Sequence, residues 1–484
     1  MRRSPALPPL LVAGLGRAGA AALEAALTEN GSAGIFGWDS GTSSALVRTA
    51  KAWRTRGVPI SLGGDGVNAL ARLGFDGTII KSPGIDTDIP LLMRAREAGL
   101  SVIDELEFGW RRMTTPVVGV TGTNGKSTTC ALVAAVLRTA NRKCQVVGNT
   151  EFGPPLSAAA RDNDVIVCEV SSFQLEACPT FLPEFAIFTN LTPEHLTRHG
   201  TMAAYGAIKS RMFVRDPSTC GVAIVNLDDP FGRSLLDTVK SAGGRALSYG
   251  FAADADVQVR SAEWDVTGAR IAIAWQDRCI ELMTKLPGRY NARNFAAAFA
   301  FGIAADIEVA KIVEGLELAI APPGRWQVMT SDEPFDVIVD YAHTPDGLVQ
   351  VLSTAQVIVR RRGARLHALF GPVGLPDPSK AAGCAEALAA FSDHVILTTG
   401  SAPRSARILR IKQLYDAIKG RCEIEIVLSR KEAMARAIAS AGIGDIVLLL
   451  GIGALGRLIV DARGTIEPFD DRTCAASLLG RLKH

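Results

Sequence analysis

The sequence lacks most of the features that mark membrane, secreted and nucleic-acid-binding proteins. Aromatic residues make up only 6% of its 484 residues, and no apolar run is long enough to cross a bilayer. The formal net charge of +3 is too small to indicate a nucleic-acid or membrane partner. The nine cysteines are dispersed without a CxxC pair, which argues against a disulfide framework or a zinc finger. A cytoplasmic protein with reduced thiols is expected.

The sequence does contain three successive blocks in which short apolar runs alternate with amphipathic helical stretches. This alternation predicts parallel sheets with crossover helices, so the expected fold class is α/β. The apolar run after the basic N-terminus is short and leads into a glycine-rich turn, so we expect a strand there rather than a signal peptide. The expected domains are Rossmann-like over 1–112, P-loop ATPase-like over 113–321 and Rossmann-like over 322–484.

Changes in pattern suggest where these blocks meet. The polar stretch 109–116 is the expected first linker, and the proline-rich stretch 321–325 marks the second boundary. Between residues 257 and 286 apolar residues alternate one by one with polar ones, which predicts antiparallel hairpins at the edge of the central sheet.

The strongest chemical signal is the string GVTGTNGKST at residues 119–128. A strand ends there, a glycine-rich turn follows and a helix begins at Lys126, so backbone N–H groups and the helix dipole can surround phosphate oxygens. Lys126 is expected to neutralise the β- and γ-phosphates, and Ser127 to bind Mg²⁺. The general pattern has glycine six positions before the lysine, where this chain has Val120. An ordinary strand-to-helix turn is the alternative.

A second glycine-rich turn, Gly14-Leu-Gly-Arg-Ala-Gly19, also follows a strand and opens a helix. Asp39 follows the next strand at about the Rossmann distance. Taken alone, this pattern is a dinucleotide-binding fingerprint and makes an NAD-dependent dehydrogenase the competing hypothesis. A further alternative is that the glycines only tighten the packing of the strand and the helix.

Several strings resemble the Mur ligases and the related folate polyglutamate ligases. The loop GVTGTNGKST has the form found in that family. Five more follow the family order: SPGI (82–85), VGNTEFG (147–153), CEVSSFQLE (168–176), NLTPEHLTRHGTMAAYGAIKSRMF (190–213) and PGRYNARNFAAA (287–298). The resemblance implies an ATP-dependent ligase that activates a carboxylate as an acyl phosphate and joins it to an amino acid during peptidoglycan precursor synthesis.

The resemblance also implies roles for individual residues. The implied ATP contacts are Gly122, Thr123, Asn124, Gly125, Lys126, Ser127, Thr128, Asn291, Asn294, Arg325 and Asp340. The implied catalytic residues are Lys126, Glu169, His195 and Lys209, with Lys209 carbamylated as in most relatives. The implied Mg²⁺ ligands are Ser127, Glu169, His195 and Lys209. The implied contacts to the UDP-linked substrate are Leu15, Asp39, Gly84, Asn149 and His195. Tyr290 stands where relatives usually carry histidine.

The incoming amino acid is harder to infer. The first two thirds resemble the glutamate-adding branch, so the expected substrates are UDP-N-acetylmuramoyl-L-alanine and glutamate, in the D form with the L form as the alternative. The string Asp340-Tyr-Ala-His-Thr-Pro-Asp346 is instead typical of branches that add diaminopimelate or lysine. The Asp-Asn-Pro-Arg string by which those branches read the amino acid is replaced by Ser401-Ala-Pro-Arg404. Candidate amino-acid contacts are Thr344, Lys380 and Arg404. ATP and Mg²⁺ are the expected cofactors, and the enzyme is expected to act as a monomer.

Overall fold

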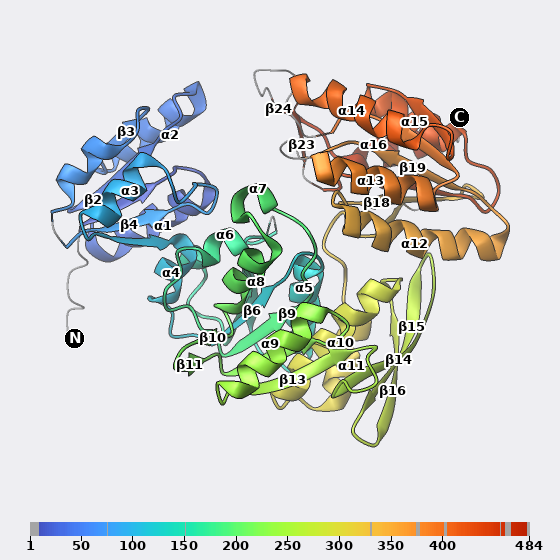
Figure 1. Ribbon diagram of the computed structural model, residues 1–484, viewed down its shortest axis with the longest axis horizontal. Helices are drawn as coiled ribbons and strands as arrows, with labels where there is room; N and C mark the ends of the chain where they lie inside the picture. Colours follow the sequence, from blue (N-terminus) through green and yellow to red (C-terminus); the bar gives the residue numbers. More distant parts are fainter. Residues whose placement is uncertain are drawn as a thin grey trace.

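The computed structural model describes residues 9–74, 76–150, 152–329, 332–373, 378–400, 404–454, 456–459 and 466–481. Three α/β units follow one another along the described chain, coloured blue, green to yellow, and orange in Figure 1. Each has a parallel or mostly parallel sheet with helices packed against it, so the expected α/β class is confirmed. The domain limits at residues 112 and 321 remain predictions. No helix in the described segments combines the length and apolar character that a membrane span requires.

The N-terminal unit is a five-stranded parallel sheet in the order β3-β2-β1-β4-β5. Its strands are β1 (Leu10–Ala13), β2 (Ile35–Asp39), β3 (Ile60–Leu62), β4 (Thr78–Lys81) and β5 (Ser101–Asp104). Its helices are α1 (Arg17–Asn30), α2 (Ser44–Thr55), η1 (Val67–Arg72), α3 (Pro90–Glu97) and α4 (Glu105–Trp110). The strand order reverses between β1 and β4, and ligands of open α/β sheets bind in the crevice beyond the carboxyl ends at such a point.

The expected linker at 109–116 is partly wrong, because α4 extends to Trp110. Asp104 caps this helix, accepting a hydrogen bond from the Leu106 N–H at 3.0 Å. Gly109 packs so tightly that a Cβ there would lie 2.7 Å from the Ser157 nitrogen of the central unit. The first two residues of this segment therefore belong to a helix that packs on the central unit.

The central unit is a nine-stranded sheet in the order β16-β15-β14-β13-β12-β9-β6-β8-β7. Its strands are β6 (Val117–Thr121), β7 (Cys144–Gly148), β8 (Val165–Glu169), β9 (Phe185–Phe188), β12 (Val222–Asn226), β13 (Arg245–Gly250), β14 (Val257–Asp265), β15 (Gly268–Trp275) and β16 (Arg278–Thr284). Its helices are α5 (Lys126–Thr139), η2 (Leu156–Ala158), α6 (Ser172–Leu175), α7 (Leu196–His199), α8 (Met202–Ser210), α9 (Pro230–Ser241), α10 (Arg289–Ala304) and α11 (Val309–Leu318). A short hairpin joins β10 (Val214–Arg215) to β11 (Ser218–Thr219).

The expected antiparallel hairpins are confirmed as β14, β15 and β16 at one end of this sheet. They extend toward the C-terminal unit, where β14 and β15 lie beside α12 (Pro345–Arg362; Figure 1). The Trp264 indole donates to the Thr354 carbonyl at 3.3 Å, and the Trp326 indole donates to the Val266 carbonyl at 3.0 Å. These contacts fix the C-terminal unit on the central one.

The C-terminal unit is a six-stranded sheet in the order β17-β18-β22-β19-β20-β21, with only β17 antiparallel to its neighbour. Its strands are β17 (Gln327–Met329), β18 (Asp336–Asp340), β19 (Leu366–Phe370), β20 (His394–Leu397), β21 (Glu423–Ile426) and β22 (Ile446–Leu450). The remaining helices and hairpin strands are α13 (Pro378–Phe391), α14 (Arg404–Ile418), α15 (Arg430–Ala439), β23 (Arg457–Ile459), β24 (Ile466–Pro468) and α16 (Asp471–Arg481). The segments that follow β18 and β19 therefore leave the same edge of the sheet, on either side of β22.

Candidate active site

The glycine-rich turn between β6 and α5 has a backbone that only glycine fits at two positions. Gly122 and Gly125 have φ angles of 147° and 86°, in the region that favours glycine. A Cβ at Gly122 would lie 1.9 Å from Thr189 Oγ1, and one at Gly125 would lie 2.6 Å from Asn294 Oδ1. The two glycines therefore allow both the curl of the loop and the close approach of its supports.

The end of β9 holds this loop in place. The Thr189 hydroxyl donates to the Asn124 carbonyl at 2.7 Å, and the Asn124 N–H donates to Asn190 Oδ1 at 2.9 Å. The Thr123 N–H donates to the Asn190 carbonyl at 2.9 Å. Lys126 Nζ donates to the Thr123 carbonyl at 2.7 Å, so its ammonium lies against the loop. The loop is thus fixed from behind by side-chain and main-chain groups of Thr189 and Asn190.

Glu169 faces the first turn of α5 because β8 is the parallel neighbour of β6, with Val120 paired to Glu169. The Ser127 hydroxyl donates to Glu169 Oε2 at 2.6 Å, and Glu169 is only 4% exposed. A hydroxyl and a carboxylate beside a phosphate loop form an oxygen donor pair that suits Mg²⁺, which usually takes one or two protein carboxylates together with substrate phosphates. No group of three or more His, Cys, Asp or Glu residues suited to a metal ion is found in the described part of the chain.

Lys209, on α8, lies behind the same loop with a side chain that is almost fully buried. Its Nζ donates to the Gly122 carbonyl at 2.8 Å and lies 4.6 Å from the centre of the Tyr205 ring. Burial and the nearby Lys126 ammonium hold the pKa of Lys209 well below its usual range. Carbon dioxide reacts with the uncharged amine, so an environment that lowers the pKa of Lys209 favours carbamylation. Lys209 is not among the described residues that line the cleft.

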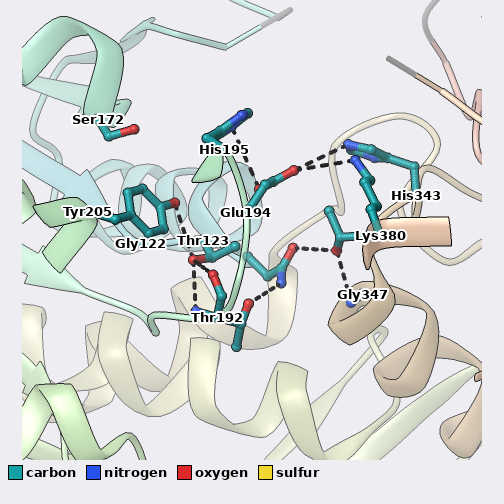
Figure 2. Close-up of polar contacts among 12 residues, drawn as sticks. Gly122, Thr123, Ser172, Thr192, Glu194, His195, Tyr205, His343, Gly347 and Lys380 are labelled. Atoms are coloured by element: carbon teal, nitrogen blue, oxygen red, sulfur yellow. Dashed lines mark hydrogen bonds and ion pairs between the residues drawn. The ribbon is translucent and has the colours of Figure 1, made fainter. Parts of the chain in front are cut away.

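A cluster that the sequence analysis missed is centred on Glu194 (Figure 2). Its carboxylate lies 3.8 Å from the His195 ring, 3.8 Å from His343 Nε2 and 3.8 Å from Lys380 Nζ. Burial alone would raise the pKa of Glu194, but His195, His343 and Lys380 hold it below its usual range. The only signal for Glu194 in the sequence is its place beside His195 in the string NLTPEHLTRHG.

The two histidines of this cluster both have a lowered pKa. Burial lowers the pKa of His343 to about 4, and Lys380 adds to this shift. Burial also lowers the pKa of His195, whose ring packs against Phe173 at 4.6 Å between centroids. His195 adopts a left-handed φ of 58° at the start of α7, which turns its ring toward the cleft that it lines.

The opposite wall of the cleft comes from α10 and the C-terminal unit. Asn291 and Asn294 are buried one turn apart, and Asn294 Nδ2 donates to Asn291 Oδ1 at 3.1 Å. Arg325 lies with its guanidinium 4.7 Å from the Tyr341 ring centre. Asp340 accepts hydrogen bonds from the Trp326 and Ala342 N–H groups, both at 2.7 Å. These four predicted ATP contacts and residues 123–128 all line one cleft, which confirms that they lie together.

The phosphate loop touches the C-terminal unit directly through one side chain. Asn124 Nδ2 donates to Asp346 Oδ2 at 2.8 Å, and Thr344 Oγ1 donates to Asn124 Oδ1 at 3.5 Å. Thr344 also caps α12, accepting from the Gly347 N–H at 3.1 Å. The predicted amino-acid contact Thr344 is therefore within reach of the nucleotide loop, and Asp346 is a second cleft residue that the sequence analysis did not single out.

Three of the predicted UDP contacts gather elsewhere, at the carboxyl edge of the N-terminal sheet. The Leu15 and Gly41 N–H groups donate to the two oxygens of Asp39, both at 2.8 Å, and Gly84 lies exposed in the loop after β4. Asn149 is different, because it lines the main cleft and its N–H donates to the Glu169 carbonyl at 2.8 Å. The predicted residues therefore mark two places, the N-terminal crevice and the cleft.

The third predicted amino-acid contact cannot be placed. The Arg404 side chain and residues 401–403 lie outside the described residues, as do residues 374–377 of the loop before α13. Lys380, on α13, is described and belongs to the Glu194 cluster.

Two family models match the central and C-terminal units. Residues 120–302 match the Mur ligase middle domain, and residues 324–453 match the domain described as Mur ligase, glutamate ligase domain. The chain is 32% identical over 387 residues to the UDP-N-acetylmuramoyl-L-alanyl-D-glutamate--2,6-diaminopimelate ligase of Aquifex aeolicus, covering 75% of this chain and 77% of that protein. It is also 32% identical over 422 residues to the enzyme of the same name from Pseudomonas syringae pv. tomato, covering 81% and 84%.

Solved structures agree with these matches. A UDP-N-acetylmuramoyl-L-alanyl-D-glutamate--2,6-diaminopimelate ligase aligns with 26% identity and a TM-score of 0.55, over 84% of this chain and 93% of that one. A UDP-N-acetylmuramate-alanine ligase from Thermotoga maritima, at 21% identity, shares the fold with a TM-score of 0.62 over 98% and 99% of the two chains. The curated relatives named above add diaminopimelate, whereas the sequence analysis expected the glutamate-adding branch. That finer expectation receives no support from them.

Proposed function

This chain belongs to the Mur ligase family, and on that premise we propose that its cleft forms an acyl phosphate on a UDP-N-acetylmuramoyl peptide and passes the acyl group to an amino acid. The enzyme is an ATP-dependent amide ligase of peptidoglycan precursor synthesis, so the dehydrogenase hypothesis drawn from the N-terminal glycines is wrong. The substrates, the metal and the roles of single residues are the proposed part.

One observation carries the proposal, namely the Ser127–Glu169 pair at 2.6 Å beside a phosphate loop that only glycine can form at Gly122 and Gly125. The N–H groups of residues 122–128 and Lys126 hold the phosphates of ATP. Ser127 and Glu169 would hold Mg²⁺, and His195 and a carbamylated Lys209 are the further ligands that we propose. When bound, Mg²⁺ offsets the negative charge that phosphoryl transfer concentrates on the phosphate oxygens.

The remaining cleft residues position the other reactants. Asn291, Asn294, Arg325 and Asp340 bind the nucleotide from the facing wall. Arg325 approaches from the C-terminal unit, and its planar guanidinium suits phosphate oxygens. The peptide carboxylate attacks the γ-phosphorus, and the resulting acyl phosphate then meets the amine. Since three reactants must lie in line, the docking of two units over one cleft contributes to the rate by orientation.

The Glu194 cluster is suited to the amine. A carboxylate held ionised among His195, His343 and Lys380 can bind the ammonium of the incoming amino acid. The ammonium must lose a proton before it attacks. At the other end of the substrate, Leu15, Asp39 and Gly84 hold the UDP group in the N-terminal crevice, with the pyrophosphate at the start of α1.

Two acceptor reactions remain candidates, and each is favoured by a specific observation. Addition of 2,6-diaminopimelate to UDP-N-acetylmuramoyl-L-alanyl-D-glutamate is favoured by the relatives and by the string Asp340–Asp346. Addition of D- or L-glutamate to UDP-N-acetylmuramoyl-L-alanine is favoured by the string CEVSSFQLE and by Ser401–Arg404, which replaces the string that reads diaminopimelate.

The test offers both UDP precursors with ATP, Mg²⁺ and each amino acid in turn, and measures ADP release. ADP release that depends on one amino acid supports the ligase, and its absence with every pair contradicts the proposed substrates. Lys126→Ala should abolish this release. Lys240→Ala, an exposed lysine at the end of α9, is the matched control and should leave it unchanged.

A further inference from the structure

The loop after β4 links the N-terminal unit to the central one. The Ser82 hydroxyl donates to the Gly14 carbonyl at 3.2 Å, so this loop packs on the glycine-rich turn that opens α1. At the other end of the loop, the Ile85 carbonyl accepts a hydrogen bond at 2.9 Å from Arg198 Nη2, on α7 of the central unit. Residues 82–85 therefore lie between the crevice proposed to hold UDP and a side chain of the central unit.

Arg198 is held in one orientation by its neighbours. Its Nε donates to Glu176 Oε1 at 2.9 Å, and its Nη2 donates to Glu176 Oε2. Both side chains are largely buried, with 13% of Arg198 and 10% of Glu176 exposed. The guanidinium also lies 4.3 Å from the centre of the Phe173 ring. Because a carboxylate bound through both oxygens fixes the plane of a guanidinium, Arg198 presents the second hydrogen of Nη2 to Ile85 in a defined geometry.

Phe173 connects Arg198 to the wall of the main cleft. The centre of its ring lies 4.6 Å from the centre of the His195 ring. His195 lines the cleft, and its Nε2 lies 3.8 Å from the Glu194 carboxylate (Figure 2). Arg198 therefore contacts the loop of the N-terminal unit through Ile85 and the wall of the cleft through Phe173.

Other contacts hold the two units together without Arg198. The Asp104 N–H donates to the Ala177 carbonyl at 2.8 Å. The buried Lys81 Nζ donates to the Phe173 carbonyl at 3.4 Å and to Asp104 Oδ2 at 3.3 Å. Loss of the Arg198 side chain should therefore release the loop from the wall of the cleft while the units stay docked.

We propose that Arg198 is a positioning residue that fixes the UDP-binding loop relative to the cleft. The inference rests on the proposed function, in which one molecule binds at two places, with its UDP group in the N-terminal crevice and its peptide carboxylate in the cleft. Such a ligand gains affinity from its second site only where the two sites are held at the separation that it spans. Because Arg198 keeps this separation constant, the complete precursor binds more tightly than UDP alone.

The test measures this gain in affinity. Isothermal titration calorimetry of the full-length enzyme with a non-hydrolysable ATP analogue gives the Kd of UDP and that of the UDP-N-acetylmuramoyl peptide that supports ADP release. Arg198→Met keeps an apolar side chain against Phe173 but removes the donor to Ile85. It should raise the Kd of the precursor about 10-fold and leave the Kd of UDP within about twofold of the wild type. The kcat/KM for the precursor should fall by at least the same factor, since the carboxylate is less well aligned.

Two further variants separate positioning from folding. Arg198→Lys keeps a cation that can donate to the Ile85 carbonyl, so it should recover part of the lost affinity for the precursor. Arg211→Met is the matched control, because Arg211 is exposed and donates to the Glu176 carbonyl at 3.4 Å. It should keep the wild-type Kd for both ligands. A general loss of stability would weaken UDP and the precursor alike, and thermal unfolding of each variant measures it.

Hydrogen exchange tests the same link in the wild type, without any substitution. UDP is proposed to contact the N-terminal unit, whereas residues 196–199 form α7 of the central unit. Saturating UDP should slow amide exchange at residues 196–199 in the wild type, because ordering of the loop 82–85 also orders Arg198. The same addition should leave exchange at these residues unchanged in Arg198→Met.

The outcomes separate the inference from the function on which it rests. If UDP binds without slowing exchange at 196–199, or if folded Arg198→Met keeps the wild-type gain of the precursor over UDP, the inference is wrong and the ligase stands. If neither UDP precursor supports ADP release, the proposed function is wrong and the inference is wrong with it. Should Arg198→Met fail to fold, the exchange measured in the wild type and the Kd values of Arg198→Lys still decide.

Discussion

Replacing Gly125 by alanine tests whether the turn before α5 binds phosphate. Gly125 has a φ of 86°, and a Cβ there would lie 2.6 Å from Asn294 Oδ1. The left-handed conformation costs an alanine about 1–2 kcal/mol. Moving Asn294 away would also weaken its hydrogen bond to Asn291 Oδ1, at 3.1 Å, which is worth about 1 kcal/mol. The native conformation of the loop is thus about 2–3 kcal/mol less favourable in Gly125→Ala than in the wild type.

If the loop escapes this strain by opening, its N–H groups no longer surround the phosphates. A loss of about 2–3 kcal/mol then lowers kcat/KM for ATP by roughly 30- to 150-fold, because each 1.4 kcal/mol is a factor of ten. Initial rates at varied ATP, with the other substrates saturating, give this value, and urea unfolding gives the stability. Gly243→Ala is the matched control, since Gly243 has a φ of 75° but open space around it. It should lose about 1 kcal/mol of stability and no ATP affinity. Normal kcat/KM for ATP in Gly125→Ala would refute the phosphate-binding role.

Three further changes test other parts of the site. Glu169→Gln keeps the shape of the partner of Ser127 but removes its charge, so kcat/KM should fall about 100-fold and more Mg²⁺ should be needed for half-maximal rate; an unchanged Mg²⁺ titration would contradict the metal role. Folding lowers the pKa of His343 to about 4, so as the pH falls below about 6.5 this histidine takes up a proton in the unfolded chain before it does so in the folded one. The free energy of unfolding of the wild type should therefore drop between pH 6.5 and 4, by up to about 3 kcal/mol. His343→Gln should flatten this drop in urea unfolding, and equal slopes would show that His343 is protonated in the fold. Asp346→Ala removes the hydrogen bond from Asn124, at 2.8 Å, and should lower kcat/KM for ATP about 5- to 10-fold without a change in fold by circular dichroism; a wild-type value would mean that this contact does not support closure.

The nucleotide half of the site could be predicted from the sequence because its parts are local or lie on neighbouring strands. The loop before Lys126 is one continuous string, and Glu169 ends β8, the direct neighbour of the loop strand β6. The hairpins between residues 257 and 286 were also predictable, since strict alternation of apolar and polar residues indicates strands with one buried face. Family strings then identified Asn291, Asn294, Arg325 and Asp340, which the structure brings to one cleft.

The amine side was not predictable in the same way. Glu194, His343 and Lys380 come from three separate segments. Only the docking of the C-terminal unit on the central one brings His343 and Lys380 to 3.8 Å from the Glu194 carboxylate. The linker at 109–116 was partly wrong for a related reason, because the packing of Gly109 against the central unit leaves no mark in the sequence.

The contact between Asn124 and Asp346 gives this enzyme a place where docking of the C-terminal unit on the nucleotide loop can be blocked. The side chain of Asn124 belongs to the nucleotide loop and at the same time bridges to the first turn of α12. A small molecule wedged at that bridge would need no likeness to ATP, to a nucleotide sugar or to an amino acid. By keeping the two units apart, it would prevent the alignment of the reactants on which the rate depends.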